Sequence, residues 1–302
     1  MTKEVVVLSG KGGTGKTTVL AALAQAAADS SRLVLADVDL DAANLGLLLA
    51  PRTLAEHDFV GGRLPVIAHE RCIDCGSCLE ACRFDALSKA EGTGRYVVDP
   101  VACEGCAACK HRCPAGAISM EEQVAGRWFL AETRFGPLVH AHLFAGQENS
   151  GKLVTTVKQQ ARELAQRDGH GLLLVDGPPG IGCPVIAACA GADLALLVAE
   201  PTVAGAHDLE RVLATVRHFR VRPLVCINKY DVNPARSGEI ERFCAQEGVA
   251  VVGRIPFDTA VTEAMVAGLT IGEWARQAPA RGEAVAREMA SIWSKTQAFL
   301  LD

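Results

Sequence analysis

The sequence predicts an α/β protein: a doubly wound, mostly parallel sheet interrupted by a small inserted domain. Short aliphatic runs alternate with helical stretches over most of the 302 residues, as in parallel sheets covered on both faces. Aromatic residues are 5% of the chain and all hydrophobic types 49%, so the core must be largely aliphatic. A cysteine-rich segment breaks the alternation after the second expected strand, which indicates an insertion there.

The apolar runs and the helical periodicity place the elements in order. Strands are expected at 4–8, 33–37, 138–143, 172–176, 194–199, 223–227 and 249–253. Helices are expected at 16–28, 152–166, 205–219, 236–247, 258–267 and 282–299. The last helix can gather Met289, Ile292, Trp293 and Phe299 on one face. Its only basic residues there are Arg287 and Lys295, so we expect it to pack on the domain rather than lie on a membrane.

Charge and hydropathy argue against several classes of protein. The formal net charge of −5 gives no general support for nucleic-acid binding. The sequence has no apolar run of transmembrane length, and Met1 leads into a strand without a signal peptide. We therefore expect a cytoplasmic protein with no membrane anchor, in which twelve cysteines are metal ligands rather than disulfides.

Eight of the cysteines lie between residues 72 and 113 in two runs of C-x2-C-x2-C-x3-C. The second run starts 31 residues after the first, and the flanks "CRFDALS" (82–88) and "CPAGAIS" (113–119) repeat as well. This repetition indicates an internal duplication. The two runs are Cys72, Cys75, Cys78 and Cys82, then Cys103, Cys106, Cys109 and Cys113.

The spacing is that of bacterial ferredoxins with two [4Fe–4S] clusters, where the fourth cysteine of each run ligates the other cluster. We expect one cluster on Cys72, Cys75, Cys78 and Cys113, and the other on Cys103, Cys106, Cys109 and Cys82. Zinc is the alternative, although zinc sites usually combine separated C-x2-C pairs. Arg83 replaces the proline that usually follows the fourth cysteine, as Pro114 does, and could tune its cluster.

Residues 10–17 read GKGGTGKT, a complete G-x-x-x-x-G-K-[ST] phosphate-binding loop between an expected strand and helix. Backbone N–H groups of such a loop cradle phosphates. Lys16 would reach the β- and γ-phosphates, and the Thr17 hydroxyl would bind Mg²⁺. The expected nucleotide-binding residues of this segment are Gly10, Lys11, Gly12, Gly13, Thr14, Gly15, Lys16, Thr17 and Thr18.

Lys11 is not required by the general loop. It makes KGGTGKTT resemble the deviant Walker A loop of the MinD/ParA ATPases and of the nitrogenase iron protein. The resemblance covers nearly the whole chain and is closest to MinD-superfamily ATPases that carry an inserted ferredoxin domain. It implies that Lys11 reaches across an ATP-dependent homodimer, or a heterodimer with a paralogue, to the phosphates bound by the other subunit.

Two further segments resemble catalytic parts of that family. In "LVLADVDLDAANL" (33–45), Asp39 matches the acidic residue that positions the attacking water, with Asp37 and Asn44 beside it. In "LLLVDGPPGIG" (172–182), Asp176 matches the residue that holds a magnesium-bound water. The alternative for aspartates at strand ends is a turn or cap.

The expected base-binding residues are Asn228 and Pro256. "VCINKYD" (225–231) also contains N-K-x-D, which reads guanine in GTPases, but the deviant loop favours ATP, with Asn228 on adenine. "RIPFDTAV" (254–261) would place Pro256 against the purine. Surface turns are the alternative for both. The segments "FAGQENSGKLV" (144–154) and "EPTVAGAHDLERV" (200–212) also resemble this group.

Cys183 lies seven residues after Asp176, where the nitrogenase iron protein has a ligand to a cluster shared between subunits. Such a cluster needs two cysteines per subunit, and none occurs between 114 and 182. We therefore expect Cys183 to be a small buried thiol. Cys226 and Cys244 are expected in the core or on a helix face.

The sequence thus predicts a P-loop ATPase domain at 1–65 and 121–302, with a ferredoxin-like α+β domain inserted at 66–120. Its expected cofactors are ATP, Mg²⁺ and two [4Fe–4S] clusters. The favoured function is an ATPase that gates electron transfer to an unknown redox or docking partner. The alternatives are a MinD/ParA-like spatial organiser with redox input, and an ATPase for iron–sulfur cluster assembly or delivery.

Overall fold

The computed structural model describes residues 2–144, 150–278 and 281–301, which form two compact units. The first unit comprises residues 1–57, 128–142 and 150–302. The second comprises residues 58–127 and a short segment that begins at Leu143. Residues 66–120, the expected insertion, lie within the second unit. Of the segment 144–154, whose sequence resembles the MinD-type group, residues 145–149 lie outside the described residues.

The strands form a sheet in the order β11-β10-β9-β1-β8-β2-β7-β6-β3. Pairing is parallel from β11 through β7. The chain order reverses at β1, which lies between β9 and β8, and ligands of doubly wound sheets bind at such a point. The bounds are β1 (Lys3–Ser9), β2 (Leu33–Asp37), β3 (Arg52–Ile67), β6 (Ile118–Thr133), β7 (Gly136–Leu143), β8 (Leu172–Pro179), β9 (Leu194–Ala199), β10 (Arg222–Asn228) and β11 (Ala250–Ile255).

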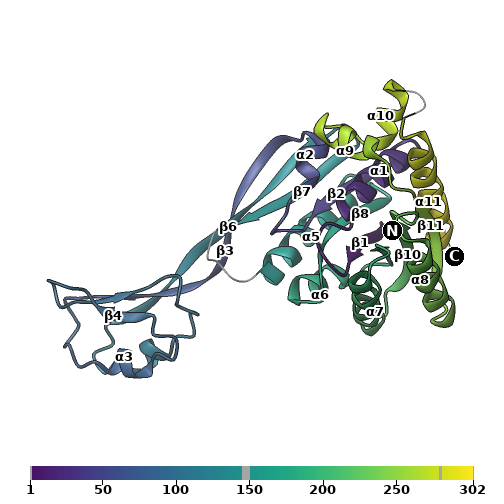
Figure 1. The fold of residues 1–302 in the computed structure, drawn as a ribbon. Coiled ribbons are helices and arrows are strands. Elements are labelled where there is room, and N and C mark those ends of the chain that lie inside the picture. Colours follow the sequence, from purple (N-terminus) through teal and green to yellow (C-terminus); the bar gives the residue numbers. More distant parts are fainter. Residues whose placement is uncertain (1, 145–149, 279–280, 302) are drawn as a thin grey trace. The chain divides into compact units, whose positions relative to one another are not determined.

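Helices cover both faces of the parallel strands (Figure 1). One core cluster joins the sheet to α1, α2, α9, α10 and α11, while α5, α7 and α8 pack on strands β2, β9, β10 and β11. The bounds are α1 (Lys16–Ala28), α2 (Leu45–Leu49), α5 (Ser150–Arg167), α6 (Cys183–Cys189), α7 (Val203–His218), α8 (Pro234–Gln246), α9 (Thr259–Val266), α10 (Ile271–Gln277) and α11 (Glu283–Leu301). The doubly wound, mostly parallel class is therefore confirmed.

The last helix behaves as expected from its apolar face. Met289, Ile292 and Trp293 are buried, and Phe299 packs against the same core. Lys295 Nζ donates a hydrogen bond to the Val252 carbonyl at 2.9 Å. No helix among the described residues is long and apolar enough to cross a membrane.

Every expected strand and helix is present, but several elements escaped the sequence patterns. Strands β3 and β6 contain many polar residues and do not alternate cleanly between buried and exposed positions. Helices α2, α6 and α10 are too short for a 3.6-residue period to be read from the sequence.

The second unit is a small α+β structure. It contains α3 (Ser77–Ala81), α4 (Ala108–Arg112) and the antiparallel pair β4 (Leu87–Lys89) and β5 (Tyr96–Val98). Its own core is built from Cys78, Leu87, Tyr96, Cys109 and Ile118. Two of these five core residues are cysteines.

Candidate nucleotide site and cysteine sites

The phosphate-binding loop connects β1 to α1 at the point where the sheet reverses its order. Gly15 has φ of +90°, and a Cβ there would clash with the Asn228 side chain, so the left-handed turn needs glycine. Asn228, at the end of β10, donates from Nδ2 to the Thr14 carbonyl at 2.7 Å. The loop is therefore tied to a strand two positions away in the sheet.

Lys16 lies between two carboxylates brought from different strands. Its Nζ is 3.0 Å from Asp39 Oδ2 and 2.9 Å from Asp176 Oδ1, and all three side chains are buried. Thr17 donates to Asp176 Oδ2 at 2.6 Å. The register of β2 and β8 also places Asp37 opposite Asp176. Residues far apart in the sequence thus form one charged centre at the base of the loop.

Burial and charge shift the pKa values of this centre. Burial alone would lower the pKa of Lys16, but the charges of Asp176 and Asp39 outweigh it and raise that pKa. Burial raises the pKa of Asp176, against the opposing effects of Lys16 and Thr17. Burial, and then the charge of Asp176, raise the pKa of Asp37 well above its ordinary value. One lysine therefore neutralises a cluster rich in acids.

Two buried oxygens in this centre have no hydrogen-bond partner among the described residues, Asp39 Oδ1 and Thr14 Oγ1. A buried polar atom without a partner is costly, and both atoms belong to residues that line a cavity beside the loop. Carboxylate and hydroxyl oxygens are ligands that Mg²⁺ and its waters prefer. The residues present therefore fit a magnesium–nucleotide ligand.

The cavity has a volume of about 500 Å³, within the range of small-molecule sites. It is lined by the loop from Gly12 to Thr18, together with Asp39, Asn44 and Asn228. The cavity is also lined by residues that the sequence motifs did not indicate, above all Asp41, Leu47 of α2, and Thr262 and Met265 of α9. Asp41 could have been suspected from its place beside Asp39; the α2 and α9 residues carry no motif.

Four of the expected residues do not line this cavity. Asp176 lies behind Lys16, and Gly10 packs against Asp208 of α7. Pro256 is not part of the lining, although the preceding Ile255 is. Lys11 points elsewhere: its Nζ is 3.1 Å from Glu200 and 3.3 Å from Thr202 Oγ1.

Glu200 binds two lysines. Lys229 Nζ lies 2.8 Å from its carboxylate, beside the contact from Lys11. Burial would raise the pKa of Glu200, but Lys229 and Lys11 outweigh burial and lower it. In this form of the chain, Lys11 is therefore held by its own subunit.

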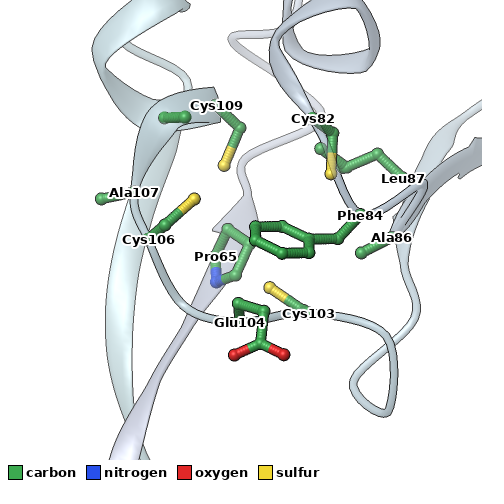
Figure 2. Close-up of a pocket in the computed structure, with 11 residues that line it drawn as sticks. Pro65, Cys82, Phe84, Ala86, Leu87, Cys103, Glu104, Cys106, Ala107 and Cys109 are labelled. Atoms are coloured by element: carbon green, nitrogen blue, oxygen red, sulfur yellow. The ribbon is translucent and has the colours of Figure 1, made fainter.

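The eight clustered cysteines separate into two sites. Cysteine site 1 is a pocket lined by Cys72, Cys75, Cys78 and Cys113. Cysteine site 2 is a pocket lined by Cys82, Cys103, Cys106 and Cys109 (Figure 2). Each pocket combines three cysteines of one run with the last cysteine of the other, which is the crossed assignment expected from the spacing.

The duplicated sequence produces a duplicated backbone. Left-handed φ angles occur at Asp74 and Gly105, at Gly76 and Ala107, and at Asp85 and Gly116, each pair 31 residues apart. Two short helices, α3 and α4, then carry the third cysteine of each run in a buried position. The two runs therefore use the same backbone turns to position their first three cysteines.

The four-thiol donor sets fit [4Fe–4S] clusters, which cysteine thiolates hold. Among the described residues, no three Cys, His, Asp or Glu side chains are spaced to hold a single metal ion. Zinc would need four ligands within about 2.3 Å of one centre. Zinc sites usually combine separated C-x2-C pairs, so the two C-x2-C-x2-C-x3-C runs favour iron–sulfur clusters over zinc.

The remaining cysteines differ in exposure. The expectation that Cys183 is buried is wrong: it is exposed, because it is the first residue of α6 and follows the exposed turn at Gly182. Cys189, Cys226 and Cys244 are buried. Burial raises the pKa of Cys226 to about 12 and those of Cys189 and Cys244 to about 11, so these three are inert core thiols.

Comparison with known proteins decides the family. The model of the CobQ/CobB/MinD/ParA nucleotide binding domain matches residues 5–271. The chain belongs to this family. An uncharacterized protein of Methanocaldococcus jannaschii is 33% identical over 230 residues, which are 76% of this chain and 79% of that protein.

Two further likenesses cover the fold and the insertion. MinD in the MinC:MinD cell division complex of Aquifex aeolicus has a TM-score of 0.59 at 18% identity, over 98% of this chain and 96% of that one. A ferredoxin of Alicyclobacillus acidocaldarius is 40% identical over 62 residues, 20% of this chain and 77% of the ferredoxin. The protein therefore combines a MinD/ParA-type domain with a ferredoxin-like segment.

Proposed function

We propose that this protein binds and hydrolyses ATP, and that nucleotide-dependent dimerisation controls electron transfer through two [4Fe–4S] clusters in the ferredoxin-like segment. The observation that carries the proposal is the sorting of eight cysteines into two four-thiol pockets, in a chain whose phosphate-binding loop is backed by Lys16, Asp39 and Asp176. The two parts supply a nucleotide switch and an electron carrier.

The contacts of the base-binding motif support ATP over GTP. Asp231, the acidic residue of N-K-x-D that would read guanine, accepts the Phe257 backbone N–H at 2.8 Å and does not line the cavity. Asn228 holds the loop and still borders the cavity. The cavity wall near Ile255, Met265 and Met289 is apolar, as an adenine ring requires.

Hydrolysis would use the charged centre behind the loop. Lys16 would exchange its carboxylate partners for phosphate oxygens, and Thr17 with Asp176 would hold Mg²⁺ and its waters. Asp39 would orient the attacking water, and its unpartnered Oδ1 leaves an acceptor free for that purpose. Each role is a proposal that follows from the contacts of these side chains.

Dimerisation would release Lys11 from Glu200. A lysine that binds the phosphates of the opposite subunit must leave the carboxylate that holds it in its own chain. The triphosphate carries more negative charge than one carboxylate, so the exchange is favourable once two ATP-bound copies meet. The contact with Glu200 would then keep Lys11 within its own chain until two ATP-bound copies meet.

The two alternatives receive less support. A scaffold that donates clusters needs accessible ligands; Cys75 and Cys106 are exposed, but Cys78 and Cys109, one at each site, are buried. A membrane-bound organiser needs a free amphipathic helix, whereas the apolar face of α11 is packed in the core. Retention of the clusters for electron transfer fits both observations better.

The test compares Lys11→Ala with Lys16→Ala under anaerobic conditions. With a non-hydrolysable ATP analogue, the parent protein should become a dimer in light scattering. Lys11→Ala should bind the nucleotide with similar affinity and stay monomeric, because only its contact across the interface is lost. Lys16→Ala should lose most nucleotide binding. A Lys11→Ala variant that dimerises like the parent would refute the proposed sandwich.

A further inference from the structure

The two cysteine sites occupy equivalent positions of the repeat but are lined differently. A shift of 31 residues maps ten of the eleven residues that line site 2 onto residues that line site 1. Leu87 then matches Ile118, and Ala86 matches Ala117. Three pairs differ in character: Phe84 against Ala115, Glu104 against Ile73, and Pro65 against Tyr96. Each site therefore serves as an internal control for the other.

Site 1 offers hydrogen-bond donors to its sulfur atoms. The Ala117 backbone N–H donates to Cys113 Sγ at 3.3 Å, and Ser77 Oγ lies 3.5 Å from Cys75 Sγ. Once Cys75 is a thiolate ligand, its sulfur can only accept, so the Ser77 hydroxyl becomes the donor. The repeat replaces Ser77 with Ala108 at site 2, which removes that donor.

Site 2 is covered by an aromatic ring. Figure 2 shows the Phe84 ring among the sulfur atoms of Cys82, Cys103 and Cys106. Phe84 is 45% exposed, so the ring stands between the pocket and solvent. Site 1 has only the methyl group of Ala115 at this position. At this position the apolar cover of site 1 is therefore smaller, while Ile73 and Tyr96 supply apolar surface elsewhere in its lining.

The charges near site 2 are weaker influences. Figure 2 shows the Glu104 carboxylate pointing away from the sulfur atoms, and the residue is exposed, so solvent screens its charge. Arg83 and Asp85 are also exposed and carry opposite charges. Lys110 and Arg112 of α4 and Glu80 of α3 are exposed as well, so solvent also screens their charges. The Ser77 hydroxyl at site 1 and the Phe84 ring at site 2 are the differences that lie beside the sulfur atoms.

Reduction adds one electron, and therefore one negative charge, to a cluster. Hydrogen bonds to the sulfur atoms and access of water stabilise the more negative reduced form, whereas an apolar cover disfavours it. We propose that the cluster at site 1 has the higher midpoint potential and the cluster at site 2 the lower. A singly reduced protein would then hold its electron at site 1.

This inference rests on the proposed function, and it adds which of the two proposed clusters has the higher midpoint potential. An electron entering at either site comes to rest at site 1. Donation from site 2 is favoured when both clusters are reduced or when a partner stabilises the electron there. Site 2 is therefore the site from which the stronger reductant acts.

The test is an EPR-monitored redox titration of the full-length protein, purified without oxygen. The parent protein should show two resolved one-electron steps. Ser77→Ala should lower the midpoint potential of the higher-potential step only. The equilibrium constant for reduction at that step should fall about two- to tenfold, which is the effect of one hydrogen bond. Ser77→Thr retains the hydroxyl and should leave that step in place.

The reciprocal substitutions complete the assignment. Phe84→Ala should move only the lower-potential step, and move it upward, because water then reaches site 2. Ala108→Ser should also raise the lower step, and Ala115→Phe should lower the higher one. The inference is overturned if Ser77→Ala shifts the lower-potential step, or if Phe84→Ala shifts the higher one.

Failure of the inference is distinguishable from failure of the proposed function. Iron and acid-labile sulfide measured on the same samples report whether both clusters are present. A protein without clusters refutes the proposed electron carrier. A protein with both clusters and a single unresolved step, unmoved by these variants, refutes only the proposed order of potentials.

Discussion

At the scale of single residues, Lys16 also stabilises the fold, besides its proposed role in binding phosphate. Its amine is the buried cation between Asp39 and Asp176. Removing one partner of a buried ion pair leaves an uncompensated charge, which costs about 3–5 kcal/mol. The buried charges of this centre are therefore balanced by the same side chain that we propose to bind phosphate.

We predict that Lys16→Ala destabilises the nucleotide-free protein, and more at pH 8 than at pH 5. The pKa of Asp176 is already raised in the fold, and loss of the amine raises it further. A carboxyl whose folded pKa lies above its unfolded value loses stability as the pH rises between the two values. Melting temperatures measured anaerobically at both pH values should fall by about 5–10 °C at pH 8 and by less at pH 5.

An exposed lysine provides the matched control. Lys3 pairs with Asp193 at 3.7 Å, and both side chains are largely exposed, so Lys3→Ala should change the melting temperature little at either pH. Equal melting of Lys16→Ala and the parent at pH 8 would show that the carboxylates are neutralised by something other than this lysine.

At the scale of elements, a second buried lysine fixes the helix that follows the Asp176 loop. Lys158 of α5 lies 2.8 Å from Glu4 of β1. It also donates to carbonyls at the C-terminal end of α6, including Ala188 and, at 3.0 Å, Ala190. Such a helix end leaves carbonyl groups without partners inside the helix, and a cation there satisfies them.

We predict that Lys158→Met loosens α6 without affecting the cysteine sites. Methionine keeps much of the volume but donates to no carbonyl, so the end of α6 should open more often. Hydrogen exchange measured by mass spectrometry should be faster in peptides covering 183–190 and unchanged in those covering 72–113. Gln159→Met, on the exposed side of the same helix, should leave both regions unchanged. Unchanged exchange in 183–190 for Lys158→Met would assign the stability of α6 to its apolar contacts alone.

The elements also show what the sequence could reveal. Strand β1 and helix α1 were predictable because a continuous buried run and a complete phosphate-loop motif adjoin each other. The spacing also predicts the crossed sets of four cysteines that line the two pockets, while their ligation of clusters stays a prediction. Strands β3 and β6 were not, because their pairing with each other, and not their side-chain pattern, defines them. The contact between Lys11 and Glu200 joins residues 189 positions apart, and no local pattern reports such a contact.

At the scale of the whole molecule, each unit has its own core. One cluster of buried residues joins the MinD/ParA-type sheet and its helices, and a separate cluster includes Cys78 and Cys109. Separate cores let each unit keep its structure when the other binds or releases a ligand. If the proposed ATP site affects the proposed clusters, the effect should be measurable as a coupling free energy between the two sites. It should not arise from a core that the two units share.

We predict that Mg-ATP shifts the midpoint potential of at least one cluster. Linkage makes the shift reciprocal: a change of about 59 mV for a one-electron step corresponds to a tenfold difference in ATP affinity between the oxidised and reduced protein. If ATP lowers the potential, the oxidised protein must bind ATP more tightly; if ATP raises it, the reduced protein must. EPR-monitored titration with and without Mg-ATP gives the shift, and equilibrium binding of ATP to both redox states gives the affinity ratio.

The two measurements must agree, which makes the prediction strict. Lys16→Ala, which should not bind ATP, should show no shift, and Lys11→Ala separates the contribution of the dimer from that of the bound nucleotide. A shift present in the parent and absent in Lys11→Ala would place the coupling in the dimer. Equal potentials with and without Mg-ATP, together with equal ATP affinities in both redox states, would uncouple the two units and leave the ferredoxin-like segment as a docking or sensing element.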